Sequence, residues 1–277
     1  MLPADFAFLA RLVQRRAGLV LTESRRGVIE NRLEAVTRRF GFKDLDQVMR
    51  ELRLGRESLA EAVTEALLIN ETSFFRDRGL FDRLGKEVLP ALMEARAADK
   101  RLRIWSAASA AGQEAYSIAM MLDSMGVAAE GWEIELIATD MSAEAIARAE
   151  RGAYSFFEVQ RGLSEGDLAV WFRAENGQYI IAEHIRRMVT FRRFNLLDSY
   201  GWLDDLDLVL CRNVLIYFDG VTRNSVLERI AETMAPSGML VLGETEAAPP
   251  AGLFQPGQIG GVCVRNPVAA SRLSAAV

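Results

Sequence analysis

Along the first 85 residues, hydrophobic positions recur at the spacing of α-helices. A first helix is predicted to end at Gly18, and a second is predicted to begin after the capping residue Thr22 and to end at Gly41. The face of the first helix that should be buried has positions i, i+3, i+4 and i+7, namely Phe6, Leu9, Ala10 and Val13. Because further short helical runs follow, we expect residues 1–85 to form an all-helical N-terminal domain.

From residue 86 onward, short hydrophobic runs alternate with helical segments, the first of which Pro90 should break or kink. Alternation of strands and helices is typical of a parallel or mostly parallel sheet. We therefore predict an α/β domain over residues 86–277. Its strands are expected at 102–107, 134–139, 206–211, 239–243 and 259–264, and its main helices at 113–125, 142–151 and 221–235.

The alternation is interrupted at about residues 154–190. Within this tract, Asn176 and Gly177 separate two strand-like runs, and this dipeptide favours a two-residue hairpin turn. We expect a small antiparallel β-subdomain inserted in the α/β domain.

The composition is that of an ordinary globular protein, with 277 residues and a formal charge of −5. The first 60 residues carry twelve basic and eight acidic side chains, which suits an acidic partner. No run reaches the roughly 18 apolar residues that span a bilayer. Two cysteines without metal-ligand spacing make neither a disulfide framework nor a metal site. We expect a cytoplasmic protein without membrane insertion; the oligomeric state is open, and a monomer is the expectation.

Polar residues follow the predicted strands, at the ends where open α/β sheets bind ligands. After the first strand, residues 106–114 form a tract of small side chains without the glycine pattern of a dinucleotide or phosphate-binding loop. Glu114 in this tract suits a cationic or amine-bearing ligand. Asp140 ends the second strand, where it either accepts both hydroxyls of a ribose or caps the next helix.

Two further groups lie later in the chain. Asn195 and Leu196 either contact a base or form a turn and a core position. Arg212 and Asn213 directly follow Cys211 at the end of a buried strand, where buried polar groups need partners. The polar pair Arg212 and Asn213 at the end of a buried strand therefore favours a functional role.

Five motifs occur in order along the chain: NETSFFRD at 70–77, RIWSAASAAGQEAYSIAM at 103–120, ATDMSAEAIARA at 138–149, FNLL at 194–197 and CRNVLIYFD at 211–219. Together they resemble the CheR family of chemotaxis receptor methyltransferases. The resemblance implies a class I, Rossmann-like methyltransferase sheet with an inserted β-subdomain and a helical N-terminal domain for substrate docking. It also implies methyl transfer from S-adenosylmethionine to glutamate side chains of chemotaxis receptors in sensory adaptation, with S-adenosylhomocysteine as product.

The resemblance assigns roles to individual residues. Glu114 would bind the amino group of the methionine moiety, Asp140 the ribose hydroxyls, and Asn195 with Leu196 the adenine. The backbone after the buried strand would line the site. The full set implied for the cofactor is Asn70, Thr72, Arg76, Glu114, Asp140, Asn195, Leu196, Cys211, Arg212 and Asn213.

Catalytic roles are implied for Arg76 and Tyr217. Arg76 would hold the incoming carboxylate by a two-pronged hydrogen bond; the alternative is a structural ion pair with Asp77 or another acid. The ring of Tyr217 would face the sulfonium; the alternative is an aromatic residue at the core edge. A glutamate carboxylate has a reference pKa of about 4.3 and needs no general base, which agrees with a chain whose one histidine is His184. Alignment and desolvation remain the main requirements.

The stretch at 70–76 is predicted to be a lid between the two domains. Phe74 and Phe75 should anchor it in the interdomain core, while Asn70, Thr72 and Arg76 face the cofactor.

The chain departs from the family pattern around Gly112. Ala111 stands where a hydroxyl residue is common, Gln113 replaces the first of two acids, and Ala115 stands where proline is common. We expect loss of the hydroxyl to weaken cofactor binding slightly, and the retained Glu114 to preserve it.

Receptor docking is the expected role of Arg25, Arg32 and Arg39, which recur every seven residues on one side of the second helix. A basic helix is complementary to receptor helices that carry glutamates; such a row is also the ordinary solvated face of a helix. The inserted β-subdomain resembles the part that takes up a receptor's C-terminal peptide in some family members. The short turn at Asn176 and Gly177 gives no basis for assigning that role.

Two other functions remain open. A methyltransferase of the same fold that acts on RNA or a small molecule would show a broad basic groove with interleaved aromatic residues, which is not evident, so we expect no nucleic-acid partner. A cofactor-binding signalling protein without turnover would keep the pocket and transfer no methyl group.

Overall fold

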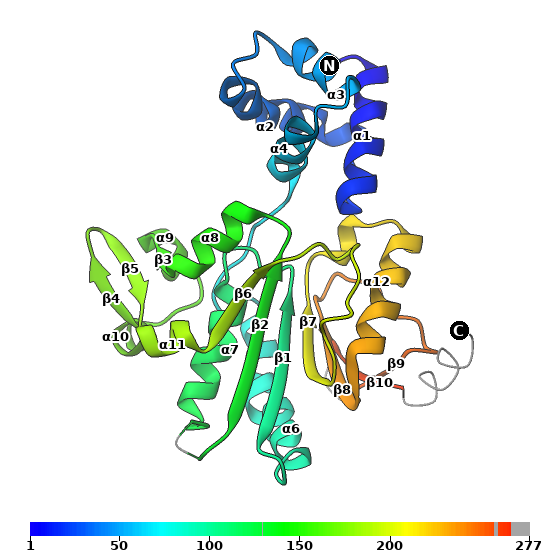
Figure 1. The fold of residues 1–277 in the computed structure, drawn as a ribbon. Helices are drawn as coiled ribbons and strands as arrows, with labels where there is room; N and C mark the ends of the chain where they lie inside the picture. The colour runs from blue at the N-terminus through cyan, green and yellow to red at the C-terminus, as the bar shows by residue number, and fades with distance from the viewer. Residues whose placement is uncertain (129, 258–259, 267–277) are drawn as a thin grey trace. The chain divides into compact units, whose positions relative to one another are not determined.

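The computed structural model describes residues 1–128, 130–257 and 260–266, which form two compact units (Figure 1). The first unit comprises Met1–Ile69 and Tyr217–Arg223, and the second comprises Asn70–Ile216 and the residues from Asn224 onward. The division falls after residue 69, whereas we predicted it after residue 85. The difference arises because the segment that begins at Asn70 packs into the core of the second unit. The start of the predicted strand 259–264 lies outside the described residues.

The first unit is helical, as predicted. Its described helices are α1 (Pro3–Ala17), the 3₁₀ helix η1 (Glu23–Arg25), α2 (Arg26–Arg39), α3 (Leu45–Arg53) and α4 (Glu57–Leu67). Each of the α-helices α1 to α4 buries a hydrophobic stripe, as an amphipathic helix must to be stable in water. The fully buried side chains include Leu9, Val13, Leu33, Val48, Leu59 and Val63.

The predicted end of α1 is confirmed, and the predicted start of α2 is wrong. Gly18 ends α1 in the left-handed conformation, with φ 72°. Thr22 precedes η1, and α2 begins only at Arg26. The Thr22 hydroxyl makes its hydrogen bond with the Ser24 hydroxyl, at 3.1 Å, and so does not cap a backbone N–H.

A segment from late in the chain completes the first unit. Leu19 and Phe218 form an isolated antiparallel bridge, and Val20 N donates to Tyr217 O at 2.8 Å. The Gln14 side chain donates to Asp219 at 2.8 Å. Residues 217–223 are therefore held by the N-terminal helices.

The second unit is built on a seven-stranded, mostly parallel sheet, which confirms the predicted fold class. The strand order is β6-β2-β1-β7-β8-β10-β9, with parallel pairing from β6 to β8 and antiparallel pairing of β10 with β8 and β9. Helices of this unit flank the sheet (Figure 1). The strands are β1 (Arg101–Ala107), β2 (Glu133–Asp140), β6 (Val189–Arg193), β7 (Leu206–Cys211), β8 (Met234–Leu242), β9 (Phe254–Pro256) and β10 (Val262–Arg265). The main helices are α7 (Gln113–Ser124), α8 (Ala143–Arg151) and α12 (Gly220–Thr233), of which α12 belongs to this unit from Asn224 on.

The predicted insertion is a three-stranded antiparallel sheet with short helices. Its strand order is β3-β5-β4. Asn176 (φ 50°) and Gly177 (φ 76°) form the hairpin turn, and both have the positive φ that a type I′ turn requires. The elements are β3 (Ala153–Tyr154), α9 (Phe156–Val159), α10 (Glu165–Trp171), β4 (Phe172–Glu175), β5 (Gln178–Ile181) and α11 (Glu183–Arg187).

A helical stretch leads from residue 78 into the sheet. It comprises α5 (Arg78–Arg83), a π-helical segment (Leu84–Val88) and α6 (Leu89–Ala95). The irregularity predicted at Pro90 thus takes the form of a π-helical segment just before it, where proline lacks an N–H donor. None of the helices in the described part of the chain has the length and hydrophobicity that a membrane span requires.

Candidate active site

The loop after β1 has an unusual backbone. Ala108 (φ 55°) and Ala110 (φ 49°) are left-handed, a conformation that costs alanine energy and is found at functional turns. Gly112 (φ 88°) is the N-cap residue of α7, and a Cβ at this position would lie 2.9 Å from Ala149 Cβ and 3.0 Å from the Phe191 ring. The loop is therefore pressed against α8 and β6 and lies at the carboxyl ends of the parallel strands, where ligands bind in such sheets.

Asp140, at the end of β2, joins two strand-end loops. Its side chain accepts the N–H groups of Ala110 and Ser142, each at 2.8 Å, and the residue is 6% exposed. The cap of α8 is Ser142, whose Oγ accepts Ala145 N at 3.1 Å. Asp140 is thus not the helix cap, and a carboxylate has additional lone pairs for a ribose diol.

Asn195 and Leu196 lie close to Asp140 because Phe194 N donates to the Asp140 carbonyl at 2.9 Å. The Asn195 Oδ1 accepts Leu197 N at 3.1 Å, which makes a turn. Leu196 is buried. The structure therefore gives this pair the turn and core positions and also places it beside the proposed ribose-binding acid.

Glu114 lies in the first turn of α7 and is fixed on both oxygens. Ser106 Oγ donates to Oε1 at 2.9 Å, and Arg212 Nη1 donates to Oε2 at 2.8 Å. The Arg212 side chain is 1% exposed and also donates through Nη2 to Asp77 Oδ2 at 2.5 Å and to Arg76 O at 3.0 Å. One buried guanidinium thus links β7, α7 and the 70–77 segment.

Phe74 and Phe75 anchor the 70–77 segment within the second unit. Phe74 makes edge contacts with Tyr154, at 5.0 Å between ring centroids, and with Phe172, at 5.5 Å. Phe75 packs against Phe81 at 5.5 Å. Both rings belong to the hydrophobic core of the second unit. The predicted anchoring in an interdomain core is therefore wrong, because the rings pack within the second unit's own hydrophobic core.

The backbone of this segment is also held. Phe75 N donates to Ser117 Oγ on α7 at 2.9 Å. A Cβ at Gly162 would lie 1.9 Å from Phe74 O, so only glycine allows this approach. Arg78 Nη1 donates to Gly162 O at 2.8 Å.

The polar residues of the segment are less restrained. The Arg76 guanidinium donates to Glu71 O at 3.2 Å and is half-buried. Its ion pair with Asp77, the structural alternative, is absent from the described chain, because Asp77 pairs with Arg212. Within the described residues, neither Asn70 nor Thr72 forms a hydrogen bond.

The remaining predicted residues follow β7. Cys211 is fully buried, and burial raises the pKa of its thiol, which disfavours a role as a nucleophile. Asn213 has φ 58°. Tyr217 belongs to the first unit, where its carbonyl accepts Val20 N. Its role beside the transferred methyl group stays a prediction.

Three residues that fix the site were not among those predicted to bind the cofactor. Ser106 and Asp77 fix Glu114 and Arg212, and both lie within the quoted motifs, although no local pattern reveals their partners. Glu246 accepts the N–H groups of Val214 and Leu215 in the loop after β7. An acid shortly after the last core strand was the available signal for Glu246.

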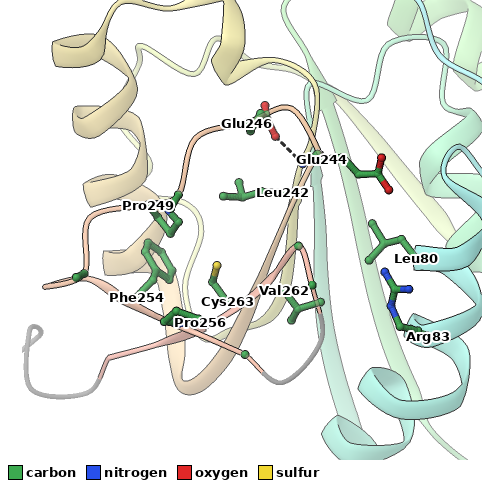
Figure 2. Close-up of a pocket in the computed structure, with 16 residues that line it drawn as sticks. Leu80, Arg83, Leu242, Glu244, Glu246, Pro249, Phe254, Pro256, Val262 and Cys263 are labelled. Atoms are coloured by element: carbon green, nitrogen blue, oxygen red, sulfur yellow. Dashed lines mark hydrogen bonds between the residues drawn. The ribbon is translucent and has the colours of Figure 1, made fainter.

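A cavity of about 600 Å³ opens beside Glu246 (Figure 2). It is bordered by α5 and by the loop and strands that follow β8, and it contains none of the residues predicted to bind the cofactor. Figure 2 shows Glu246 hydrogen-bonded towards the end of β8, with Cys263 and Leu80 on other sides of the cavity.

The residues around Glu114 fit a zwitterionic, ribose-containing cofactor. Two buried polar atoms in this loop, Ser109 Oγ and Gln113 Oε1, have no hydrogen-bond partner among the described residues. Buried polar groups of this kind are rare without a ligand or water. Together with the acids Glu114 and Asp140, they provide polar atoms for an ammonium group and a diol.

An open, mostly parallel sheet with one buried acid at the end of β2 and another in the first turn of α7 defines the class of an α/β enzyme that binds a nucleotide-type cofactor at its strand ends. Residues 70–256 match the family model for the CheR methyltransferase, SAM binding domain, and residues 4–68 match that for the CheR methyltransferase, all-alpha domain. The chain belongs to the CheR methyltransferase family, and S-adenosylmethionine is its cofactor.

Curated relatives are similar over most of their length. Chemotaxis protein methyltransferase 1 of Pseudomonas aeruginosa is 38% identical over 250 residues, which cover 88% of this chain and 90% of that protein. Chemotaxis protein methyltransferase Cher2 of Pseudomonas putida is 36% identical with the same coverage. A chemotaxis protein methyltransferase of Vibrio parahaemolyticus is 34% identical over 88% of this chain and 89% of its own.

Proposed function

We propose that this enzyme methylates glutamate side chains of chemotaxis receptors in the cytoplasm. The observation that carries the proposal is that none of the described strand-end residues is a histidine that could act as general base. The one histidine, His184, lies on α11 with its side chain 59% exposed and 3.7 Å from Asp123. A nucleophile that is already ionised, such as a carboxylate, needs no base. The relatives named chemotaxis protein methyltransferases and the two free cysteines support the receptor and the compartment.

The cofactor supplies an electrophilic methyl group on a sulfonium. Glu114, fixed by Ser106 and Arg212, is positioned to bind an ammonium group, and Asp140 to accept a ribose diol. The turn at Asn195 would contact the base. Because these acids are held in place before any ligand binds, little reorganisation is needed at the moment of reaction.

Arg76 is the proposed ligand of the acceptor carboxylate. Within the described chain it forms no ion pair, since the neighbouring acid Asp77 is bonded to Arg212. Its guanidinium retains donors for a bidentate contact that would align one carboxylate oxygen. We keep Tyr217 as the proposed aromatic partner of the sulfonium.

Receptor docking is proposed for the row of basic residues in the first unit, with a smaller contribution from Arg32 than from Arg25 and Arg39. Arg25 and Arg39 are exposed. Arg32 is half-buried and donates to Leu68 O at 2.7 Å, at the end of α4. We assign the docking contribution mainly to Arg25 and Arg39, which have their charge in solvent where it can steer an acidic partner.

The central test is transfer of labelled methyl groups to candidate receptor cytoplasmic domains, with and without their C-terminal tails. We expect base-labile label that is released as methanol. Arg76→Ala should reduce transfer by about 100-fold, Arg76→Lys should restore part of it, and Arg83→Ala, an exposed arginine on α5, should be unaffected. Label in RNA but not in receptors would refute the function, and normal transfer by Arg76→Ala would refute the role of Arg76. Product binding by calorimetry without transfer to any receptor would indicate a signalling protein.

Docking is tested separately by charge reversal. Arg25→Glu and Arg39→Glu should each raise the KM for receptor without changing kcat, with an effect that shrinks at high salt. Lys86→Glu makes the same charge change on the second unit and should leave KM unchanged. An equal rise in KM for Lys86→Glu would show that net charge, and not the first unit's surface, is responsible.

A further inference from the structure

Glu246 lies in the loop after β8, and its carboxylate binds the backbone of two loops. Oε1 accepts Val214 N at 3.0 Å and Leu215 N at 2.9 Å. Oε2 accepts Gly243 N at 2.6 Å (Figure 2). Within the described residues Glu246 has no cationic partner. An acid that is bonded only to backbone N–H groups here joins the ends of β7 and β8.

The turn that Glu246 holds is strained and tightly packed. Asn213 has φ 58°, in the left-handed region that asparagine tolerates better than most residues. A Cβ at Gly243 would lie 2.8 Å from Asn213 Nδ2 and 3.1 Å from Asn213 N, so the end of β8 presses directly on this turn. Without the acid, three backbone donors in this contact would lose their partner, which costs more than an ordinary hydrogen bond.

The same turn immediately follows Arg212. The guanidinium of Arg212 reaches Glu114 at 2.8 Å and Arg76 O at 3.0 Å. These two contacts lie at the cofactor end and the acceptor end of the proposed site. A shift of the backbone at Asn213 would therefore move both ends relative to each other.

Burial gives Glu246 an environment that disfavours its charge. Burial raises the pKa of Glu246, and the N–H groups of Gly243, Leu215, Val214 and Asn213 act in the opposite direction. A neutral side chain would avoid the desolvation cost but would offer the N–H groups fewer acceptor sites.

We propose that Glu246 is a positioning residue for methyl transfer: it holds the turn at 213–215 and thereby aligns Arg212 with Glu114 and the Arg76 backbone. The inference rests on the proposed function. Glu246 lies outside the cofactor site, and its loss should affect kcat selectively. The reason is that misalignment by about 1 Å lowers the rate by about 100-fold, while the contacts to the ribose and base persist.

The test compares Glu246→Gln with Glu244→Gln in the full chain. Glu244 lies in the same loop, is exposed and has no hydrogen bond in the described chain, so it is a matched control. Calorimetry with S-adenosylhomocysteine gives the number of binding-competent sites and the Kd. We expect Glu246→Gln to bind product at one site with a Kd within about threefold of the parent, while kcat per binding site falls by about 10- to 100-fold and the receptor KM is little changed. Glu244→Gln should match the parent.

A second readout follows the turn directly. Amide hydrogen exchange at Val214 and Leu215 should accelerate in Glu246→Gln and not in Glu244→Gln. An unchanged kcat per binding site, or a loss of rate that only tracks the loss of binding-competent protein, would overturn the proposal. Failure of the parent enzyme to methylate any receptor would refute the proposed function instead, and unchanged amide exchange in Glu246→Gln would still refute the inference.

Discussion

Replacement of Arg212 by methionine removes the charge that links Glu114 to the 70–77 segment. The Arg212 side chain is 1% exposed and that of Glu114 is 11% exposed, so the substitution leaves a nearly buried carboxylate without its cation. Asp77 is different, because its side chain is 30% exposed and water can replace the lost partner. The Arg212 guanidinium lies 5.5 Å from the centroid of the Phe81 ring. Methionine has a similar stem, so the packing against this ring is largely kept.

The magnitude follows from these burials. Loss of one partner of a buried ion pair costs about 3–5 kcal/mol, and we expect the low end, about 3 kcal/mol, because Ser106 still bonds to Glu114. The Asp77 contact should add about 0–1 kcal/mol. For a unit of about 200 residues, 3 kcal/mol corresponds to a fall in Tm of about 6–12 °C.

Tryptophan fluorescence provides a suitable assay, because all four tryptophans lie in the second unit and report its unfolding alone. Arg212→Met, Glu114→Gln and the double variant form a double-mutant cycle, for which we expect a coupling free energy of about 1–3 kcal/mol. Arg229→Met is the control: Arg229 donates only to the carbonyls of Leu197, Asp198 and Ser225, so its loss strands no charge and should cost about 1 kcal/mol. Additive effects of Arg212→Met and Glu114→Gln, to within about 0.5 kcal/mol, would refute the idea that the pair acts as a unit.

Two further predictions concern the backbone and pH. Gly162→Ala places a Cβ 1.9 Å from Phe74 O and should destabilise the second unit by about 3 kcal/mol or more, measured by tryptophan fluorescence. Gly177→Ala is the control: it is also at positive φ, but among the described residues no heavy atom lies within 4 Å of the added Cβ, so it should cost about 1 kcal/mol. Similar costs for the two variants would show that backbone strain, and not the contact with Phe74, decides the loss of stability. Thr222 N–H and then the Gln14 side chain lower the pKa of Asp219. A carboxylate whose pKa is lowered by folding stabilises the protein above its unfolded pKa, and this contribution is lost as the pH drops through the folded pKa. The decrease in Tm caused by Asp219→Ala should therefore be smaller at about pH 3 than at about pH 7. An equal decrease in Tm at both pH values would contradict this.

The parts of the fold that local chemistry determines were predictable. Asn176–Gly177 has the conformational freedom of a hairpin turn, and Gly18 ends α1 for the same reason. β6 was missed because it is an edge strand whose Arg192 and Arg193 are exposed, so VTFRR lacks the hydrophobic run of an interior strand. Edge strands carry little of the burial signal on which such predictions depend.

In the candidate site, too, the features set by local sequence were predictable and those set by long-range contacts were not. Glu114 and Asp140 were predictable from residue type and position after a strand. The partner of Glu114 was not, because Arg212 lies 98 residues away in sequence and only the pairing of β1 with β7 brings them together. Arg212 was expected to act through its backbone, and the structure adds a side chain that fixes Glu114 and Asp77.

The departures from the family pattern around Gly112 have a physical interpretation in these contacts. The Ala111 carbonyl accepts the Tyr154 hydroxyl at 2.6 Å, and Ala115 is fully buried in the core. The Gln113 carbonyl accepts Ser117 Oγ, at 2.7 Å, and the same Oγ accepts Phe75 N. The loop is therefore shaped through backbone carbonyls and packing, which a side-chain change at these positions leaves in place. The cost of the missing hydroxyl should fall on a direct contact with the cofactor, at about 1 kcal/mol for one hydrogen bond, while the geometry that holds Glu114 is preserved.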